Sequence, residues 1–134
     1  MNVIDKAVEA AIAMMNALQP FATVTRGALP TGAGITCEVS QANDAEIYLD
    51  KGAQTRINLT LNGKHANLQT LSDTMNQIHD GLTKILDPAG YPSGTGWRIV
   101  DMWTYAYPRI IGRESDNKWL MGSTLTVNLE MKGV

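Results

Sequence analysis

Apolar residues recur every three to four positions at the start of the chain, which is the spacing of one face of an α-helix. The stripe runs from Ile4 to Leu18, and charged residues fall between its members. Asn2 can cap the first turn. Pro20 disfavours helical geometry in the residue before it. The pattern therefore predicts a helix over 3–18.

A regular alternation of apolar and polar residues follows a glycine-rich loop, and this alternation indicates half-buried strands. Strands are predicted at 35–40, at 46–50 and at 55–62. The Asn62–Gly63 pair is typical of a turn, so we expect it to end the third strand.

A second amphipathic pattern predicts a helix over 67–86, and Pro88 is expected to stop it. The rest of the chain is expected to form a long hairpin. Its first strand begins at Trp97 and ends at Pro108, since proline cannot donate a backbone hydrogen bond. Residues 110–118 then form the connection.

The strand that returns from this connection is predicted over 119–131. Strands joined by short turns are antiparallel, and each amphipathic helix needs a surface to cover. The 134 residues fit one domain. The sequence therefore predicts a single α+β domain over 1–134, with one mostly antiparallel β-sheet and both amphipathic helices packed on one face.

The composition is that of a globular protein, with 44% hydrophobic and 18% charged residues. Its 11 basic and 13 acidic residues give a net charge of −2, which argues against binding nucleic acid through general electrostatics. No apolar run approaches the roughly 20 residues that a membrane span needs. The apolar beginning of the chain lacks the basic region of a signal peptide. We expect no membrane partner and synthesis in the cytoplasm.

The sequence offers no recognisable catalytic group. Cys37 is alone, and a buried, inert thiol is the common case. His65 and His79 are 14 positions apart (79 − 65), about 20 Å along a helix and too far for one metal ion. We expect His65 to start the second helix and His79 to lie at the boundary of its buried face. No enzyme activity, catalytic residue, cofactor or metal is predicted.

Aromatic residues are concentrated in the last hairpin. Trp97, Trp103, Tyr105 and Tyr107 are expected on one face of its first strand, and Trp119 begins the second. Two interpretations are open, because aromatic residues dominate both cores and subunit interfaces. Base stacking on a single strand is a third interpretation, but the near-neutral charge provides no electrostatic groove for it.

Charge is unevenly distributed along the chain. Acidic residues lie in the early strands and their loop, at Glu38, Asp44, Glu46 and Asp50. Basic residues lie in the last hairpin, at Arg98, Arg109, Arg113 and Lys118. Solvated surface is the simpler interpretation. The alternative is an acidic face that meets the basic face of an identical neighbour, a head-to-tail contact that can close into a ring. The candidate subunit-interface residues are Asp44, Glu46, Asp50, Arg109, Arg113, Glu114 and Trp119.

Several motifs resemble a known family in their order and spacing. The run IIGRESDNKWLMGSTLTVNLEM at 110–131 resembles the C-terminal signature of small minor capsid proteins from tailed phages and prophages of Gram-positive bacteria. YLDKG at 48–52 and LNGKHANLQTLSDTMNQIH at 61–79 are similar to the middle section of that family. GTGWRIVDM at 94–102 resembles its approach to the hairpin. The resemblance covers about residues 45–131.

The resemblance implies a role like that of the tail terminators of long-tailed phages. Such subunits form a ring, usually a hexamer, on the last ring of the tail tube. The ring stops tube growth and docks to the filled head. The implied fold is a sheet with helices on one side.

The implied partners are further copies of this chain, the tail-tube protein and a head-completion or neck protein. DNA would only pass through the lumen, and a sequence pI near 5.6 suits a lumen that repels phosphate. The implied location is the head–tail junction of a virion, assembled in the bacterial host cytoplasm. A head-completion or other neck protein is the alternative role, and a nucleic-acid-binding module is a further one.

Overall fold

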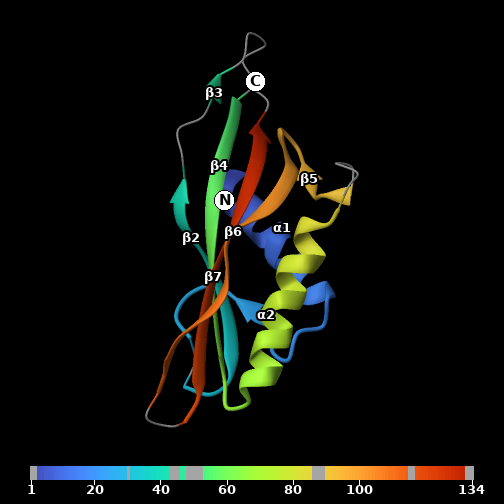
Figure 1. The fold of residues 1–134 in the computed structure, drawn as a ribbon. Helices are drawn as coiled ribbons and strands as arrows, with labels where there is room; N and C mark the ends of the chain where they lie inside the picture. The colour runs from blue at the N-terminus through green and yellow to red at the C-terminus, as the bar shows by residue number, and fades with distance from the viewer. Residues whose placement is uncertain are drawn as a thin grey trace.

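The computed structural model describes residues 3–29, 31–42, 46–47, 53–85, 90–114 and 117–131. Its elements in chain order are α1 (Val3–Ala17), β1 (Val24–Thr25), β2 (Gly34–Ala42), β3 (Glu46–Ile47), β4 (Ala53–His65), α2 (Leu68–Thr83), β5 (Ser93–Gly94), β6 (Trp97–Arg113) and β7 (Trp119–Met131). The strands form a seven-stranded sheet, and Figure 1 shows how it twists along its length. The predicted α+β fold is confirmed.

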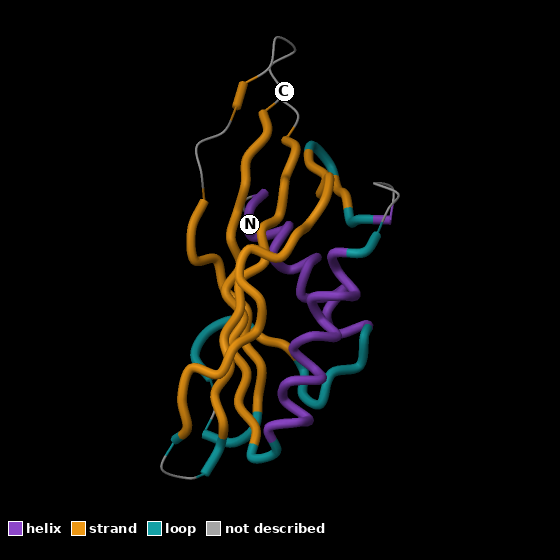
Figure 2. Tube along the Cα trace, viewed as in Figure 1, coloured by secondary structure: helices purple, strands orange, loops and turns teal. Residues whose placement is uncertain are grey.

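The strand order in the sheet is β1-β2-β4-β7-β6-β5, and β3 pairs with β4 as a continuation of the β2 edge. Only β1 and β2 are parallel, and the other pairs are antiparallel. β4 and β7 pair without a shift from Ala53↔Met131 to His65↔Trp119, so they form the regular centre of the sheet. Both helices lie on one side of this sheet (Figure 2).

The hydrophobic core lies between the helices and the facing side of the sheet. The alternation along β4 places Ile57, Leu59 and Leu61 inward, where they are fully buried. Leu71 and Met75 of α2 are fully buried against this side. Burial of each such side chain contributes roughly 1.5–3 kcal/mol, so packing on α2 fixes which face of β4 points inward.

The start of α2 follows from its capping residue. Asn67 has extended backbone geometry, and its side chain accepts a hydrogen bond of 3.1 Å from the backbone N–H of Thr70. The helix ends at Thr83, earlier than the predicted 67–86. The strand predicted at 46–50 appears as the short β3, and its remaining residues lie outside the described part of the chain.

The prediction that Asn62–Gly63 ends a strand is wrong. β4 continues to His65, because its pairing with β7 continues past this dipeptide. Gly63 instead allows α2 to approach the sheet. A Cβ atom at Gly63 would lie 2.7 Å from Leu71 Cδ1 and 2.9 Å from Met75 Sδ.

The predicted end of the hairpin strand at Pro108 is also wrong. β6 runs to Arg113, so the first residues of the predicted connection 110–118 belong to the strand. The register of β6 against β7 shifts between Ala106 and Arg109, and Pro108 lies between these two residues. Proline is tolerated at bulges and on edge strands, where its missing N–H breaks no ladder.

The aromatic residues of β6 do not share one face. The register also shifts between Ile99 and Asp101, and Val100 is the extra residue. One extra residue exchanges the two faces of the strand beyond it. Trp97, before the bulge, is therefore in the core, whereas Trp103, after it, is exposed on the opposite face.

Candidate assembly surface

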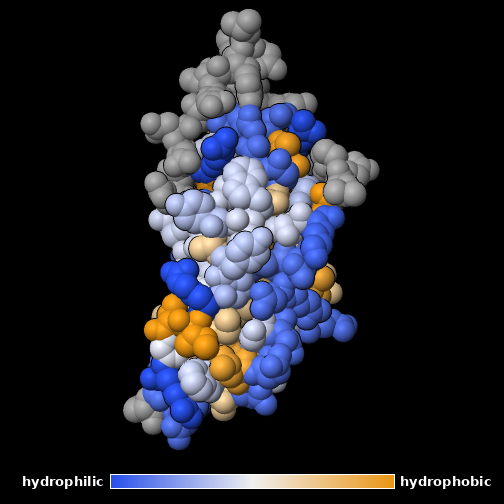
Figure 3. All heavy atoms as spheres, viewed as in Figure 1, coloured by the Kyte–Doolittle hydropathy of each residue, from blue (hydrophilic) through white to orange (hydrophobic). Residues whose placement is uncertain are grey.

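Large hydrophobic side chains are exposed together on β6. Within the described part of the chain, the exposed ones are Trp103, Tyr105, Tyr107, Ile110 and Ile111; we call these five residues the β6 patch. Tyr105 and Tyr107 are 70% and 73% exposed. Figure 3 shows hydrophobic atoms gathered over the lower half of the molecule, where β6 and β7 run. A contiguous group of this kind marks an interaction surface.

The position of β6 in the sheet explains this exposure. β5 pairs with β6 only at Trp97 and Arg98. From Ile99 onward, none of the described strands covers the outer edge of β6. Such an edge can accept a further strand, but four register shifts and Pro108 interrupt this one. Side chains rather than backbone groups therefore dominate the surface.

One part of the patch lies on the sheet face that the helices leave uncovered. The guanidinium carbon of Arg56 lies 5.6 Å from the centroid of the Trp103 ring, in cation–π geometry. A shallow pocket of about 180 Å³ is lined by Arg56, Asn58, Trp103, Tyr105 and Thr126. Trp, Tyr and Arg are the residue types that contribute most to protein interfaces. The pocket has the composition of a protein-contact site.

Another part of the patch borders α2. A groove of about 360 Å³ is lined by Leu68, Gln69 and Ser72 of α2, by Pro108, Arg109 and Ile110 of β6, and by Met121 of β7. Ile111 lies toward the other sheet face, because a Cβ atom at Gly122 would be 3.4 Å from its Cδ1 atom. The patch therefore wraps around the edge of the sheet.

Two of the predicted interface residues lie beside this patch. Arg109 and Arg113 are exposed. The guanidinium carbon of Arg113 is 4.7 Å from the centroid of the Trp119 ring, which is partly buried against the core. These two arginines give the patch a positive border.

Glu114 has a contact within the chain. Its Oε2 atom is 2.8 Å from Nζ of Lys64, whose side chain is only 4% exposed. A buried ammonium group needs such a partner. Of the acidic candidates, Asp44 and Asp50 lie outside the described residues, and Glu46 is placed in β3 only by its backbone.

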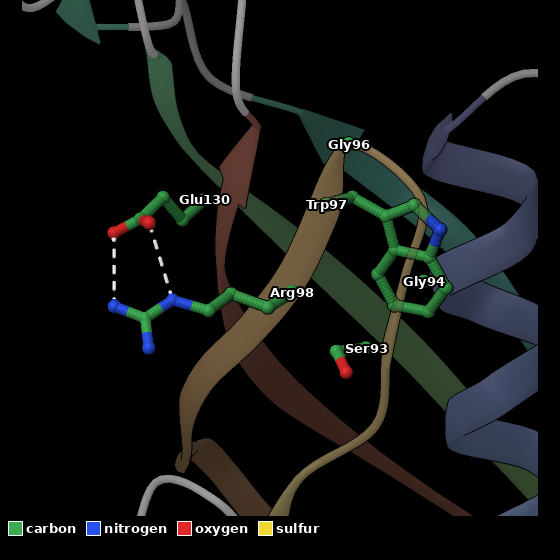
Figure 4. A pocket seen from close by; sticks show the side chains of 6 residues that line it. All are labelled: Ser93, Gly94, Gly96, Trp97, Arg98 and Glu130. Carbon is green, nitrogen blue, oxygen red and sulfur yellow. Dashed lines mark hydrogen bonds and ion pairs between the residues drawn. The ribbon is translucent and has the colours of Figure 1, made fainter.

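Arg98 belongs to a different pocket at the other end of β6. Figure 4 shows Arg98 pointing toward Glu130, with hydrogen bonds of 3.1 and 3.3 Å, and away from Trp97. The pocket, of about 270 Å³, also includes Ser93, Gly94 and Gly96. Because Glu130 neutralises Arg98, this pocket does not extend the positive border.

A carboxylate cluster that sequence reasoning missed lies at the opposite edge of the sheet. Arg26 follows β1, and its guanidinium group contacts Glu38 at 2.6 Å, Asp5 at 3.2 Å and Glu9 at 3.6 Å. The hydrogen bond from Arg26 lowers the pKa of Glu38. The three carboxylates and the one guanidinium of this cluster carry a net charge of −2.

His79 is in the core and not at the boundary of α2, so that prediction is wrong. It is 2% exposed. Its Nδ1 and Nε2 atoms lie 2.8 Å from Thr104 Oγ1 and 2.7 Å from Ser123 Oγ. Burial lowers its pKa to about 4, so the ring is neutral at pH 7 and joins α2 to β6 and β7.

His65 lies just before α2, as predicted. Its Nδ1 atom accepts a 2.8 Å hydrogen bond from the backbone N–H of Asn67, and its ring packs edge-on against Phe21. Cys37 is buried, and burial raises the pKa of its thiol to about 12. A neutral thiol is not a nucleophile at pH 7.

Neither a metal site nor a membrane span is found in the described part of the chain. No three His, Cys, Asp or Glu side chains among those residues are grouped to hold a metal ion. Neither described helix is long and apolar enough to cross a bilayer.

No family model and no curated protein matches this chain. Among solved structures, it resembles a chain from the virion of a native gene transfer agent (GTA) particle, with 16% sequence identity and a TM-score of 0.61. The match covers 97% of this chain and 99% of that chain. The two chains therefore share one fold over nearly their whole lengths.

Proposed function

We propose that this chain is a structural subunit of a phage or prophage particle, which forms a ring at the head–tail junction, ends growth of the tail tube and docks to the head. The observation that carries the proposal is the fold shared, end to end, with a chain of a GTA virion. A match without unmatched domains on either side supports an equivalent unit of assembly.

The β6 patch supports a function that depends on contacts. Its five residues are large, apolar and exposed on one strand. Exposed tyrosines and isoleucines lower the solubility of an isolated chain. Their exposure therefore indicates a surface that is covered in an assembly. The minor capsid motifs at 110–131 overlap this strand and its return.

The proposed partners are identical copies, the tail-tube protein and a head-completion or neck protein. DNA would pass through the ring without being held. The net charge of −2 favours this, because like charges repel phosphate. The likeness to a virion component supports a structural, non-enzymatic role.

Electron microscopy of particles made with and without this chain tests the terminator role. We expect tail tubes of uncontrolled length when the chain is missing, and normal lengths when it is supplied again. Free tails of normal length without the chain would rule out the terminator role.

Binding to isolated parts separates this role from that of a head-completion protein. The purified chain is expected to bind the ends of tail tubes that were assembled without it. Preferential binding to filled heads would instead favour the head-completion role. Binding to single-stranded DNA that weakens steeply with salt would favour a nucleic-acid-binding module.

A further inference from the structure

We infer that the β6 patch and its arginines bind the carboxylate cluster of Asp5, Glu9 and Glu38 on a second copy of this chain. This inference rests on the proposed ring and names the two surfaces that would build it. It differs from the contact predicted from the sequence, which used Asp44, Glu46 and Asp50, because the acidic residues named here lie on α1 and β2.

The two surfaces lie at opposite edges of the sheet. β1 and β2 form one end of the strand order. Beyond Ile99, β6 forms the other end, because none of the described strands pairs with its outer side. A contact between different surfaces of identical chains repeats in one direction. It therefore generates a ring if the rotation closes.

The charges of the two surfaces are complementary. Arg109 and Arg113 carry the positive border of the β6 patch. Across the molecule, Glu9 is 50% exposed, and its closest contact to Arg26 is 3.6 Å, the longest in the cluster. A carboxylate offers about four acceptor positions, so one guanidinium cannot occupy all the acceptor positions of three carboxylates. The half-exposed carboxylate of Glu9 can therefore accept hydrogen bonds from an incoming arginine.

A contact of the β6 patch with its own copy is disfavoured by the same charges. A two-fold arrangement would bring Arg109 and Arg113 toward the same residues of the second chain. Like charges that face each other at an interface repel and weaken the contact. The head-to-tail arrangement replaces this repulsion with attraction.

Direct pairing of the two edge strands is also disfavoured. On β2, the Glu38 side chain accepts a 3.0 Å hydrogen bond from the N–H of Val39, and the register shifts between Val39 and Gln41. β6 carries four such shifts and Pro108. Irregular edges of this kind do not extend a sheet. The contact is therefore made by side chains.

Site-specific cross-linking tests the geometry of the contact. One chain carries Arg109→Cys and another Glu9→Cys, and a short bismaleimide is applied to their mixture and to particles assembled from both. Cys37 is buried and stays in every chain, so the unchanged chain is the blank. Arg109→Cys mixed with Lys84→Cys, at the C-cap of α2, is the matched negative pair.

We expect a dimer that joins position 109 to position 9, and none with position 84. Products that join only 109 to 109 would show a two-fold contact and overturn the inference. The absence of a 109–9 product from both the solution and the particles would overturn it as well.

A charge exchange tests the energetics. Arg109→Glu is expected to lower incorporation into particles roughly threefold to tenfold, as for a charged pair at an interface rim. Adding Glu9→Arg to the same chain should restore it. Lys84→Glu changes the net charge equally on a 74% exposed side chain, and should have no effect. No rescue by the second change would contradict the pairing.

These experiments distinguish a failure of the proposed contact from a failure of the proposed terminator role. Overlong tails without the chain, but no 109–9 product, would leave the terminator role standing and the contact wrong. A 109–9 product with normal tails in the absence of the chain would keep the contact and remove the terminator role.

Discussion

At the scale of single residues, a buried neutral histidine is the feature that sequence could not reveal. His79 occupies a helix position whose neighbours could equally have placed it at the edge of the core. Its burial depends on two hydroxyl partners, Thr104 and Ser123, which are 25 and 44 positions away. Such distant partners leave no local pattern, so the prediction of a boundary position failed.

The lowered pKa of His79 predicts a pH-dependent stability. In the folded chain the pKa of His79 is about 4, below the ordinary histidine value of 6.5. Between these values the unfolded chain binds a proton that the folded chain does not, so the free energy of unfolding falls as the pH drops from 6.5 towards 4. At low pH this effect lowers the free energy of unfolding by up to about 3 kcal/mol. Above pH 6.5 the loss is absent, because His79 is then neutral in both the folded and the unfolded chain.

Urea unfolding across this pH range checks the prediction. His79→Gln is expected to lose stability at pH 7, by about 1–3 kcal/mol, because a buried hydrogen-bonding group is replaced imperfectly. It should also show a shallower fall below pH 6.5. Asn76→Ser, an exposed and uncharged change on α2, is the control and should keep the slope of the unchanged chain. Equal slopes in His79→Gln and the unchanged chain would show that His79 does not titrate in this way.

At the scale of elements, hydrophobic periodicity predicted both helices and five of the seven described strands, but it missed the two-residue strands β1 and β5 and the ends of several elements. α1 and β7 match their predicted ranges closely. β4 and β6 are longer than predicted, because pairing with β7 overrides the local signals of Asn62–Gly63 and Pro108. Turn signals report only local preference, whereas a neighbouring strand supplies a hydrogen bond at every second residue.

The bulge at Val100 had the largest consequence for the candidate site. Alternation alone placed Trp97 and Trp103 on one face. The register shift placed Trp103 on the face that the helices leave uncovered, and the three later shifts in β6 distribute the rest of the β6 patch around the edge of the sheet. No residue type specifies a bulge of this kind, so the exposed surface could not be predicted from the sequence.

Because α2 packs closely on β4, we expect replacement of Gly63 by a larger residue to destabilise the fold. In Gly63→Ala the new methyl group would meet Leu71 Cδ1 and Met75 Sδ at 2.7 and 2.9 Å. Both side chains are fully buried, so they cannot move away freely. We expect a loss of about 1–3 kcal/mol in the free energy of unfolding, as for overpacked cores.

Gly112→Ala is the matched control, since it also lies within a strand. Its Cβ atom would have Leu120 Cδ1 as its nearest neighbour, at 4.0 Å, which is ordinary contact. Denaturant unfolding should show Gly112→Ala within about 0.5 kcal/mol of the unchanged chain. Equal losses in the two variants would mean that α2 does not press on Gly63.

At the scale of the whole molecule, the same sheet serves two purposes. One face of the sheet and both helices form the core, whereas the second half of β6 carries apolar residues into solvent (Figures 1 and 3). The fold therefore does not need the β6 patch for its own stability. This separation makes the role of the patch testable without unfolding the protein.

Tyr107→Ser with Ile111→Thr removes apolar surface from the β6 patch and little from the core, because these side chains are 73% and 51% exposed. Surface changes of this kind alter stability by about 0.5 kcal/mol or less. If the patch is covered in the particle, the loss of two central contacts should lower incorporation at least about tenfold, which corresponds to about 1.4 kcal/mol. Incorporation is measured by co-sedimentation with particles.

Asn76→Ser with Gln77→Ser on the exposed side of α2 is the matched control. A patch variant that folds normally and enters particles as well as this control would show that β6 faces solvent in the assembly, and the apolar strand would then need another explanation.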